Sequence, residues 1–298
     1  MSVEENVIDR SIPPISELRQ IAQSTKTSAD RRLSYRFFRL LSIYITRVLL
    51  HTPVTANQVT VLSILTGIAG IVLIAQQSAA IAIAGYLLMF LYHVLDKVDG
   101  EIARARKNFS IHGIYLDNIG HHLTGGGLIL ATAFRLAIML DAWAVPILFV
   151  GVMGGIACIL YRVEKQAPFH LYSQHVMVFP EIVDSLREPG SSFTRESIKK
   201  TREQDGTSIL RHGPIAVVRE LLLTLASFPV SALILLGGVT LEAGTDSIAY
   251  ALLALIIVCT IQVLAFIGIE FANLSQNLVA ECKRLHRRAK DVGDQGSD

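Results

Sequence analysis

The chain has 298 residues, of which 51% are hydrophobic and only 17% are charged, and its mean hydropathy is +0.47. Soluble globular proteins carry about a quarter charged residues, so this composition excludes an ordinary soluble domain. The formal net charge of +2 gives no reason to expect a nucleic-acid partner, and three cysteines, two of them inside apolar stretches, argue against a disulfide framework.

The part of the chain before the apolar stretches is expected to have two segments. Residues 1–30 are polar and mixed in charge, so we interpret them as a polar N-terminal tail without a cleavable signal peptide. Residues 31–56 interleave arginines with aromatic and aliphatic side chains, which is typical of an amphipathic helix in the membrane interface, followed here by a turn at Pro53. The alternative is a seventh membrane span, in which five arginines would have to be hidden.

Six stretches predict membrane-spanning helices, because each approaches the ~20 residues with which a helix crosses the hydrocarbon core. Four of them contain no Asp, Glu, Lys or Arg: 57–75, 142–161, 221–241 and 247–269. The other two, 79–95 and 114–134, end beside or contain polar residues. Those polar residues should face the helix bundle or a wet cavity, since lipid cannot satisfy them.

The predicted fold class is therefore an all-α integral membrane protein, in which the interfacial amphipathic helix precedes six transmembrane helices. The catalytic domain spans 57–272 with a cytosolic loop at 180–213, and a basic, then polar tail follows at 273–298. Basic residues concentrate in alternate connections, and the opposite connections carry only acids or no charge. By the positive-inside rule, we expect both termini in the cytoplasm, and the size of the chain suggests a bacterial inner membrane.

Residues that could bind a metal or take part in catalysis gather where the second span ends and the third begins. Asp96 and Asp99 are three apart, and Asp117 and His121 are four apart, so each pair shares one helix face. Two helices joined by a short loop run antiparallel, so both faces can border one cavity near the cytoplasmic membrane surface. Three neighbouring carboxylates repel one another, and a divalent cation relieves that repulsion. Oxygen ligands indicate Mg²⁺ or Mn²⁺ as the cofactor.

The residues after the aspartates suit a substrate that carries phosphate. Gly100 and Ala103 leave space beside the helix backbone, and Arg104 offers a planar fork to phosphate oxygens. Acids at a helix end can be merely solvated, and a glycine in a membrane helix can be a packing contact. The matched spacing across two adjacent spans nevertheless favours a diphosphate held by metal and arginine.

This stretch resembles the signature of the CDP-alcohol phosphatidyltransferase family, D-x2-D-G-x2-A-R-x8-G-x3-D-x3-D. The matching residues are Asp96, Asp99, Gly100, Ala103, Arg104, Gly113 and Asp117. The resemblance implies transfer of a substituted phosphate from a CDP-alcohol to the hydroxyl of a second alcohol, with release of CMP. It also implies that the three aspartates hold the metal, that the glycine–alanine–arginine segment borders the cytidine diphosphate with Gly113 beside it, and that the protein is a homodimer.

His121 departs from the signature, which has a fourth aspartate at this position, usually assigned as the base that activates the acceptor hydroxyl. A neutral imidazole can accept a proton and can also ligate a metal. We therefore expect His121 to be the catalytic base, and we count it among the metal ligands. The alternatives are a spectator role in an active enzyme and a site that has lost activity. His122, on the neighbouring face, is the residue that could replace His121.

Weaker candidates lie outside the signature. Three cations near span ends could bind a phosphorylated acceptor or a lipid headgroup: Arg162, Lys165 and Arg219. Cations at span ends often only snorkel to the membrane surface. His93 could line the cavity, although helix packing is its more ordinary role. Glycines could let helices approach closely, within one chain or in a dimer, at positions 125–127, 151, 154 and 155.

The expected function is phospholipid synthesis with CDP-diacylglycerol as the default donor, an alcohol acceptor and membrane lipids as partners. A CDP-polyol donor is the main alternative, and the histidine makes it more credible. From another class, the chain could be a membrane carrier or lipid-binding protein, or a descendant that kept the fold without catalysis. A carrier would place its ionisable residues near the middle of the membrane, whereas these lie at span ends.

Overall fold

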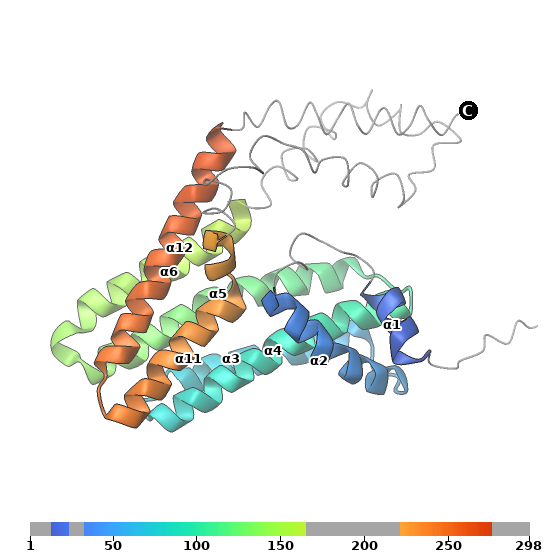
Figure 1. Ribbon diagram of the computed structural model, residues 1–298, viewed down its shortest axis with the longest axis horizontal. Coiled ribbons are helices and arrows are strands. Elements are labelled where there is room, and N and C mark those ends of the chain that lie inside the picture. Colours follow the sequence, from blue (N-terminus) through green and yellow to red (C-terminus); the bar gives the residue numbers. More distant parts are fainter. Residues whose placement is uncertain (1–12, 24–32, 165–220, 276–298) are drawn as a thin grey trace, which may run out of the picture. The chain divides into compact units, whose positions relative to one another are not determined.

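The computed structural model describes residues 13–23, 33–164 and 221–275 (Figure 1). These residues contain helices and no strand. Six helical segments have the length and composition of membrane spans. The predicted all-α membrane fold, with a helix before six spans, is therefore confirmed. The helices are α1 (Ile15–Ala22), α2 (Leu33–Leu50), α3 (Ala56–Ile74), α4 (Ala79–Ala105), α5 (Ile111–Met139), the short 3-10 helix η2 (Asp141–Trp143), α6 (Ala144–Glu164), α11 (Phe228–Thr245) and α12 (Ala249–Ser275).

The chain divides into two compact units. The first comprises Met1–Val152 with Phe228–Ile256, and the second comprises Met153–Ser227 with Ile257–Asp298. The described helices α1 to α5 and α11 belong wholly to the first unit. The second unit has a small core in which Tyr161, Ala226 and Ala265 are buried together. All signature residues lie in the first unit, which therefore contains the candidate site.

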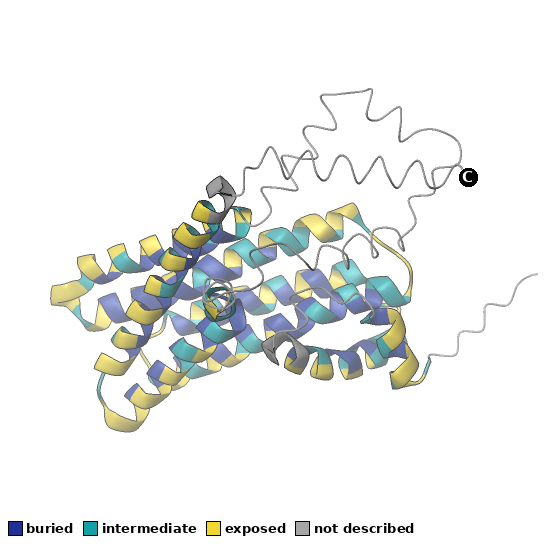
Figure 2. Ribbon diagram, turned by 45° about the horizontal axis from the view of Figure 1, so that its top comes forward, coloured by how far each residue is buried: buried dark blue, intermediate teal, exposed yellow. Residues whose placement is uncertain are grey.

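Glycines allow α3 and α4 to pack closely in the first unit. A Cβ atom at Gly85 of α4 would lie 2.7 Å from the carbonyl oxygen of Gly70 and 2.7 Å from the backbone nitrogen of Ile74, both on α3. A Cβ at Gly127 of α5 would lie 2.5 Å from Ile71 Cδ1 of α3. Packing within one chain thus accounts for Gly127, one of the glycines considered for a dimer. Of the six spans, α4 and α5 are the most deeply buried (Figure 2).

The junctions at one end of α4 and α5 tie three helices together. Arg106, which caps the C-terminus of α4, donates hydrogen bonds to the carbonyl oxygens of Val54 at 2.5 Å and Thr52 at 2.7 Å, in the turn between α2 and α3. Asn57 at the start of α3 donates to Ser110 Oγ at 3.3 Å, and Ser110 accepts from the N–H of Gly113 as the N-cap of α5. The short connection from α4 to α5 is therefore anchored on both sides.

The described part of α2 packs against α4 through polar contacts. Glu101 of α4 is buried and accepts hydrogen bonds from Ser42 Oγ at 2.7 Å and Thr46 Oγ1 at 2.6 Å, both on α2. A third donor, Gln23 Nε2, lies 2.7 Å from the same carboxylate. The opposite side of α2 exposes large apolar side chains such as Phe37 and Tyr44. Among the described helices α2 is not one of the six with span character, and its place in the membrane interface stays a prediction.

Helix α1 lies in the segment interpreted from the sequence as a polar tail. Its apolar residues Leu18 and Ala22 are fully buried with Ile43 of α2, and Ala105 of α4 packs against them. The Ala22 carbonyl oxygen accepts a hydrogen bond of 2.5 Å from Arg104 Nε. A segment of eight residues is too short to predict a helix from its sequence pattern alone. Contact with α2 and α4 stabilises it instead.

The far end of the bundle is held by a buried ion pair. Arg135 of α5 is fully buried, and its guanidinium contacts Glu242 of α11 with Nη1 at 2.8 Å and Nη2 at 2.5 Å. The same guanidinium donates to the carbonyl oxygens of Gln76 and Gln77 in the loop between α3 and α4. Arg135 follows His121 by fourteen residues on one helix, which is about 21 Å along its axis. This cluster therefore lies well away from the signature residues.

Candidate metal and phosphate site

Asp96 and Asp99 come from the last part of α4, and Asp117 and His121 from the first turns of α5. Because α4 and α5 are consecutive helices whose side chains meet, the helical spacing of each pair directs the carboxylates and the imidazole toward one another. Asp96 and Asp99 are buried, whereas Asp117 and His121 are partly exposed. The residues that α4 contributes to the site are therefore buried, and those that α5 contributes are accessible.

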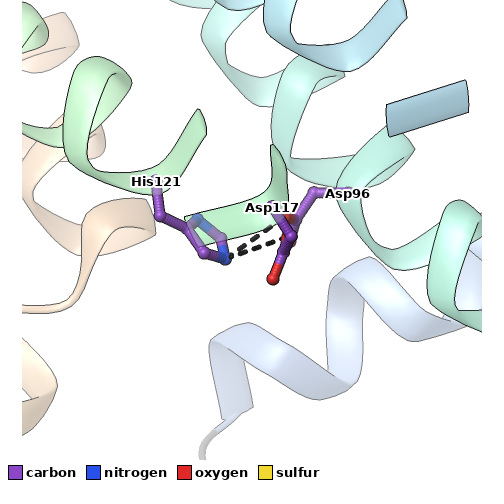
Figure 3. A group of neighbouring side chains, drawn as sticks. All are labelled: Asp96, Asp117 and His121. Carbon is purple, nitrogen blue, oxygen red and sulfur yellow. Dashed lines mark ion pairs between the residues drawn. The ribbon is translucent and has the colours of Figure 1, made fainter. Parts of the chain in front are cut away.

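Asp96, Asp117 and His121 form the centre of the site (Figure 3). Nε2 of His121 lies 3.3 Å from Asp96 Oδ1 and 3.5 Å from Asp117 Oδ1. One ligand atom from each of the three residues falls within 4.8 Å of the others. Two carboxylate oxygens and one imidazole nitrogen converging at this spacing are a donor set that fits a divalent cation.

Asp99 has a different environment. Its Oδ2 accepts a hydrogen bond of 2.6 Å from Thr60 Oγ1 of α3, and its Oδ1 accepts one of 2.5 Å from the backbone N–H of Gly100. Among the described residues, the group that could hold a metal comprises Asp96, Asp117 and His121 without Asp99. The predicted role of Asp99 as a metal ligand therefore stays a prediction, while its orientation by Thr60 is a finding.

A lysine that the sequence did not single out completes the environment of Asp96. Lys97 Nζ forms an ion pair with Asp96 Oδ2, while Asp96 Oδ1 faces His121. Successive residues on a helix do not share a face, so sequence spacing gave no signal for this contact. The ion pair places a positive charge beside the buried carboxylate of Asp96.

The remaining histidines of this region have separate environments. His93 is buried, with its ring 4.7 Å from the Phe38 ring centroid in an edge-on arrangement and stacked at 5.4 Å on Phe228. Of its two expected roles, these contacts favour helix packing. His122 Nδ1 lies 2.6 Å from the Asn118 carbonyl oxygen of its own helix, and His122 is not part of the three-residue group.

The predicted substrate-binding residues of α4 and α5 surround the same end of the bundle. The Arg104 guanidinium folds back over Gly100, so that a Cβ at Gly100 would lie 3.0 Å from Nη1. A Cβ at Gly113 would lie 2.7 Å from Asn57 Oδ1. Ala103 lies on the same turn of α4 and is partly exposed. A side chain at either position would have to displace the end of Arg104 or of Asn57. Binding of cytidine diphosphate there stays a prediction.

Arg162 belongs to the second compact unit. Lys165 and Arg219 lie outside the described residues, as do the predicted cytosolic loop 180–213 and the basic stretch of the C-terminal tail. Their predicted contacts with phosphate or lipid headgroups stay predictions.

The family comparison agrees with the signature. Residues 53–176 match the family model described as CDP-alcohol phosphatidyltransferase. The matched region contains α3 to α6 and with them every residue of the three-residue group. The comparison with curated proteins found no match. The resemblance predicted from the signature is confirmed by the family model.

Proposed function

We propose that this chain, whose residues 53–176 match the family model of CDP-alcohol phosphatidyltransferases, transfers a phosphatidyl or other phosphoalcohol group from a CDP-alcohol to an alcohol hydroxyl. The observation that carries this proposal is the convergence of Asp96, Asp117 and His121 from two neighbouring helices inside the matched region. The match to the family model supports this reaction class. The residues and substrates below are proposals.

The donor set supports a resident divalent cation, Mg²⁺ or Mn²⁺, held by Asp96, Asp117 and His121 with Asp99 nearby. Such an ion, when bound, neutralises the negative charge of a diphosphate. Without an ion, two carboxylates would face an incoming diphosphate, with Lys97 the cation paired to Asp96. A cation held by these residues would therefore also favour a substrate that carries a diphosphate.

The chemistry of the proposed step is a substitution at phosphorus. The acceptor oxygen forms a bond to the phosphorus that carries the donor's alcohol, and the bond from that phosphorus to the CMP oxygen breaks. The acceptor loses its hydroxyl proton, and CMP leaves as the phosphate monoester. His121 Nε2 is the base we propose for this proton when its lone pair is not coordinated to the ion, because His121 is partly exposed and Nε2 is directed into the site. Arg104 is proposed to contact the diphosphate oxygens.

The default donor is CDP-diacylglycerol, and phospholipid synthesis is the proposed pathway class. Six apolar spans with the site near the ends of two of them support a lipid-linked donor. A CDP-polyol donor is the alternative within the class, because His121 alters the signature at the acceptor position. A homodimer, cytoplasmic termini and a bacterial inner membrane complete the proposal.

The experiment is CMP release by the detergent-purified protein. It receives CDP-diacylglycerol and a panel of alcohols (glycerol 3-phosphate, inositol, inositol phosphate and serine) with Mg²⁺, with Mn²⁺ or with chelator. Asp117→Ala is the test variant. Asp141→Ala is the matched control, because Asp141 is an exposed aspartate in η2, beyond the other end of α5.

Metal-dependent CMP release that is lost in Asp117→Ala and kept in Asp141→Ala is the expected result, and it names the acceptor. CMP release that persists with chelator, or that survives in Asp117→Ala, contradicts the proposed site. Silence across the panel directs the same assay to a CDP-polyol donor.

A further inference from the structure

The imidazole of His121 is contacted on both of its nitrogens. Nε2 faces Asp96 and Asp117 (Figure 3), and Nδ1 lies 3.1 Å from the hydroxyl of Tyr92 on α4. The two rings are nearly perpendicular, with centroids 6.4 Å apart. Among the described residues, Asp96, Asp117 and Tyr92 contact the imidazole nitrogens, and Tyr92 is the one outside the carboxylate cluster.

Tyr92 is held firmly by its surroundings. Only 1% of it is exposed, and its ring packs edge-on against Phe228 of α11 at 5.8 Å. Glycines on two other helices leave the space it occupies: a Cβ at Gly67 of α3 would lie 3.3 Å from Tyr92 Cδ2, and one at Gly120 of α5 would lie 3.7 Å from its hydroxyl oxygen. Helices α3, α5 and α11 thus surround the tyrosine, and its hydroxyl has a fixed position beside Nδ1.

The hydroxyl can pair with either tautomer of His121, because its oxygen accepts a hydrogen bond and its O–H donates one. A cation bound at Nε2 selects the tautomer with the proton on Nδ1, and the tyrosine oxygen can then accept that N–H. A neutral imidazole carries its proton on one nitrogen and a lone pair on the other. If Nδ1–H donates to the tyrosine oxygen, the lone pair is on Nε2 and points at Asp96 and Asp117. Either role of His121 needs that lone pair, and it serves one role at a time, since a metal ligand and a general base each use an unprotonated nitrogen. Metal-bound histidines generally donate their other N–H to such a partner.

We propose that Tyr92 is a positioning residue that holds His121 with the Nε2 lone pair directed between Asp96 and Asp117. This inference rests on the proposed metal site. It also explains how the chain accommodates its departure from the signature. An aspartate at position 121 has two equivalent oxygens and needs no choice of tautomer, whereas a histidine does.

The experiment compares Tyr92→Phe with the unaltered protein in Mn²⁺ binding, measured by electron paramagnetic resonance of free Mn²⁺, and in CMP release. Phenylalanine keeps the ring that packs on Phe228 and removes only the hydroxyl. The matched control is Tyr86→Phe. Tyr86 is a fully buried tyrosine of the same helix whose hydroxyl lies 2.7 Å from Thr132 Oγ1, away from the site.

The expected result is that Tyr92→Phe weakens Mn²⁺ binding by about 10-fold or more, as loss of a partner of a metal-ligating histidine does. Tyr86→Phe binds Mn²⁺ as the unaltered protein does. In a His121→Ala background the Tyr92→Phe change has no further effect on Mn²⁺ affinity, because the ring that the hydroxyl orients is gone.

Three outcomes overturn the inference. If Asp117→Ala binds Mn²⁺ as tightly as the unaltered protein, the proposed metal site is wrong and the role of Tyr92 fails with it. If Asp117→Ala loses binding while Tyr92→Phe keeps it, the metal site stands and the inference alone fails. If Tyr92→Phe weakens binding equally in the His121→Ala background, the hydroxyl supports the fold and does not act through His121.

Discussion

Thr60 of α3 donates a 2.6 Å hydrogen bond to Asp99 of α4, and both side chains are buried. The second oxygen of Asp99 is held by the backbone N–H of Gly100. The carboxylate is thus oriented by a neighbouring helix as well as by its own. An aspartate with both oxygens engaged keeps its rotamer, and a change in Thr60 should reach the site through Asp99 alone.

Thr60→Val removes the hydroxyl and keeps the shape of the side chain. We expect it to lower metal-dependent CMP release by about 10-fold, in the range seen when a partner of a ligating group is lost. Thr60→Ser keeps the donor and should retain most of the activity. Both variants are to be compared at equal concentrations of folded protein, and equal rates for the two would show that the hydrogen bond does not matter to the site.

His121→Asp restores the residue of the family signature. Replacing a nitrogen ligand by a carboxylate oxygen favours Mg²⁺ over the softer Mn²⁺. The ratio of CMP release with Mg²⁺ to that with Mn²⁺ should therefore rise severalfold in this variant. His122→Asp is the matched control, since His122 lies next along the helix and outside the group. An unchanged ratio in His121→Asp would remove His121 from the metal ligands.

The ion pair of Arg135 and Glu242 predicts a strongly asymmetric effect on stability. Glu242→Leu leaves a buried guanidinium without its carboxylate, which costs about 3–5 kcal/mol. The double variant with Arg135→Leu removes both charges and should recover much of that loss. Thermal unfolding in detergent measures both. If the double variant is no more stable than Glu242→Leu, removing the arginine costs as much as leaving it unpaired. The hydrogen bonds from Arg135 to the carbonyl oxygens of Gln76 and Gln77 would then account for that cost.

Two glycines of membrane helices should respond oppositely to alanine. At Gly85 the new methyl would meet the backbone of α3 at 2.7 Å, and such overpacking costs about 1–3 kcal/mol. At Gly237 of α11 a Cβ meets none of the described residues within 4 Å, and alanine is favoured over glycine in a helix by about 0.5–1 kcal/mol. Gly85→Ala should lower the unfolding temperature and Gly237→Ala should not. A similar shift for both would contradict the close contact of α3 and α4.

The sequence predicted the six spans and the meeting of Asp96, Asp117 and His121 because both depend on local regularities. A span is recognised by the length of its apolar run, and a shared helix face by a spacing of three or four residues. Antiparallel neighbours then bring the two faces together. Nothing beyond the order of residues along two adjacent helices is needed for these predictions.

Other parts of the site depend on packing between helices, which the sequence does not encode locally. Tyr92 and Thr60 read as ordinary residues of apolar spans until α3, α4 and α5 are placed side by side. Lys97 contacts Asp96 despite an unfavourable spacing. Helix α1 is short, and its apolar residues Leu18 and Ala22 find their partners on α2 and α4.

The partners of Glu101 show that the folded domain extends to the N-terminal side of the matched region. The family match begins at residue 53, yet all three donors to this buried carboxylate, Gln23, Ser42 and Thr46, precede that residue. A protein trimmed to the matched region would carry an uncompensated acid two residues beyond Asp99, inside the signature itself. A domain swapped between proteins, or shortened for expression, would therefore have to keep α1 and α2, because they supply the partners of a buried acid on α4.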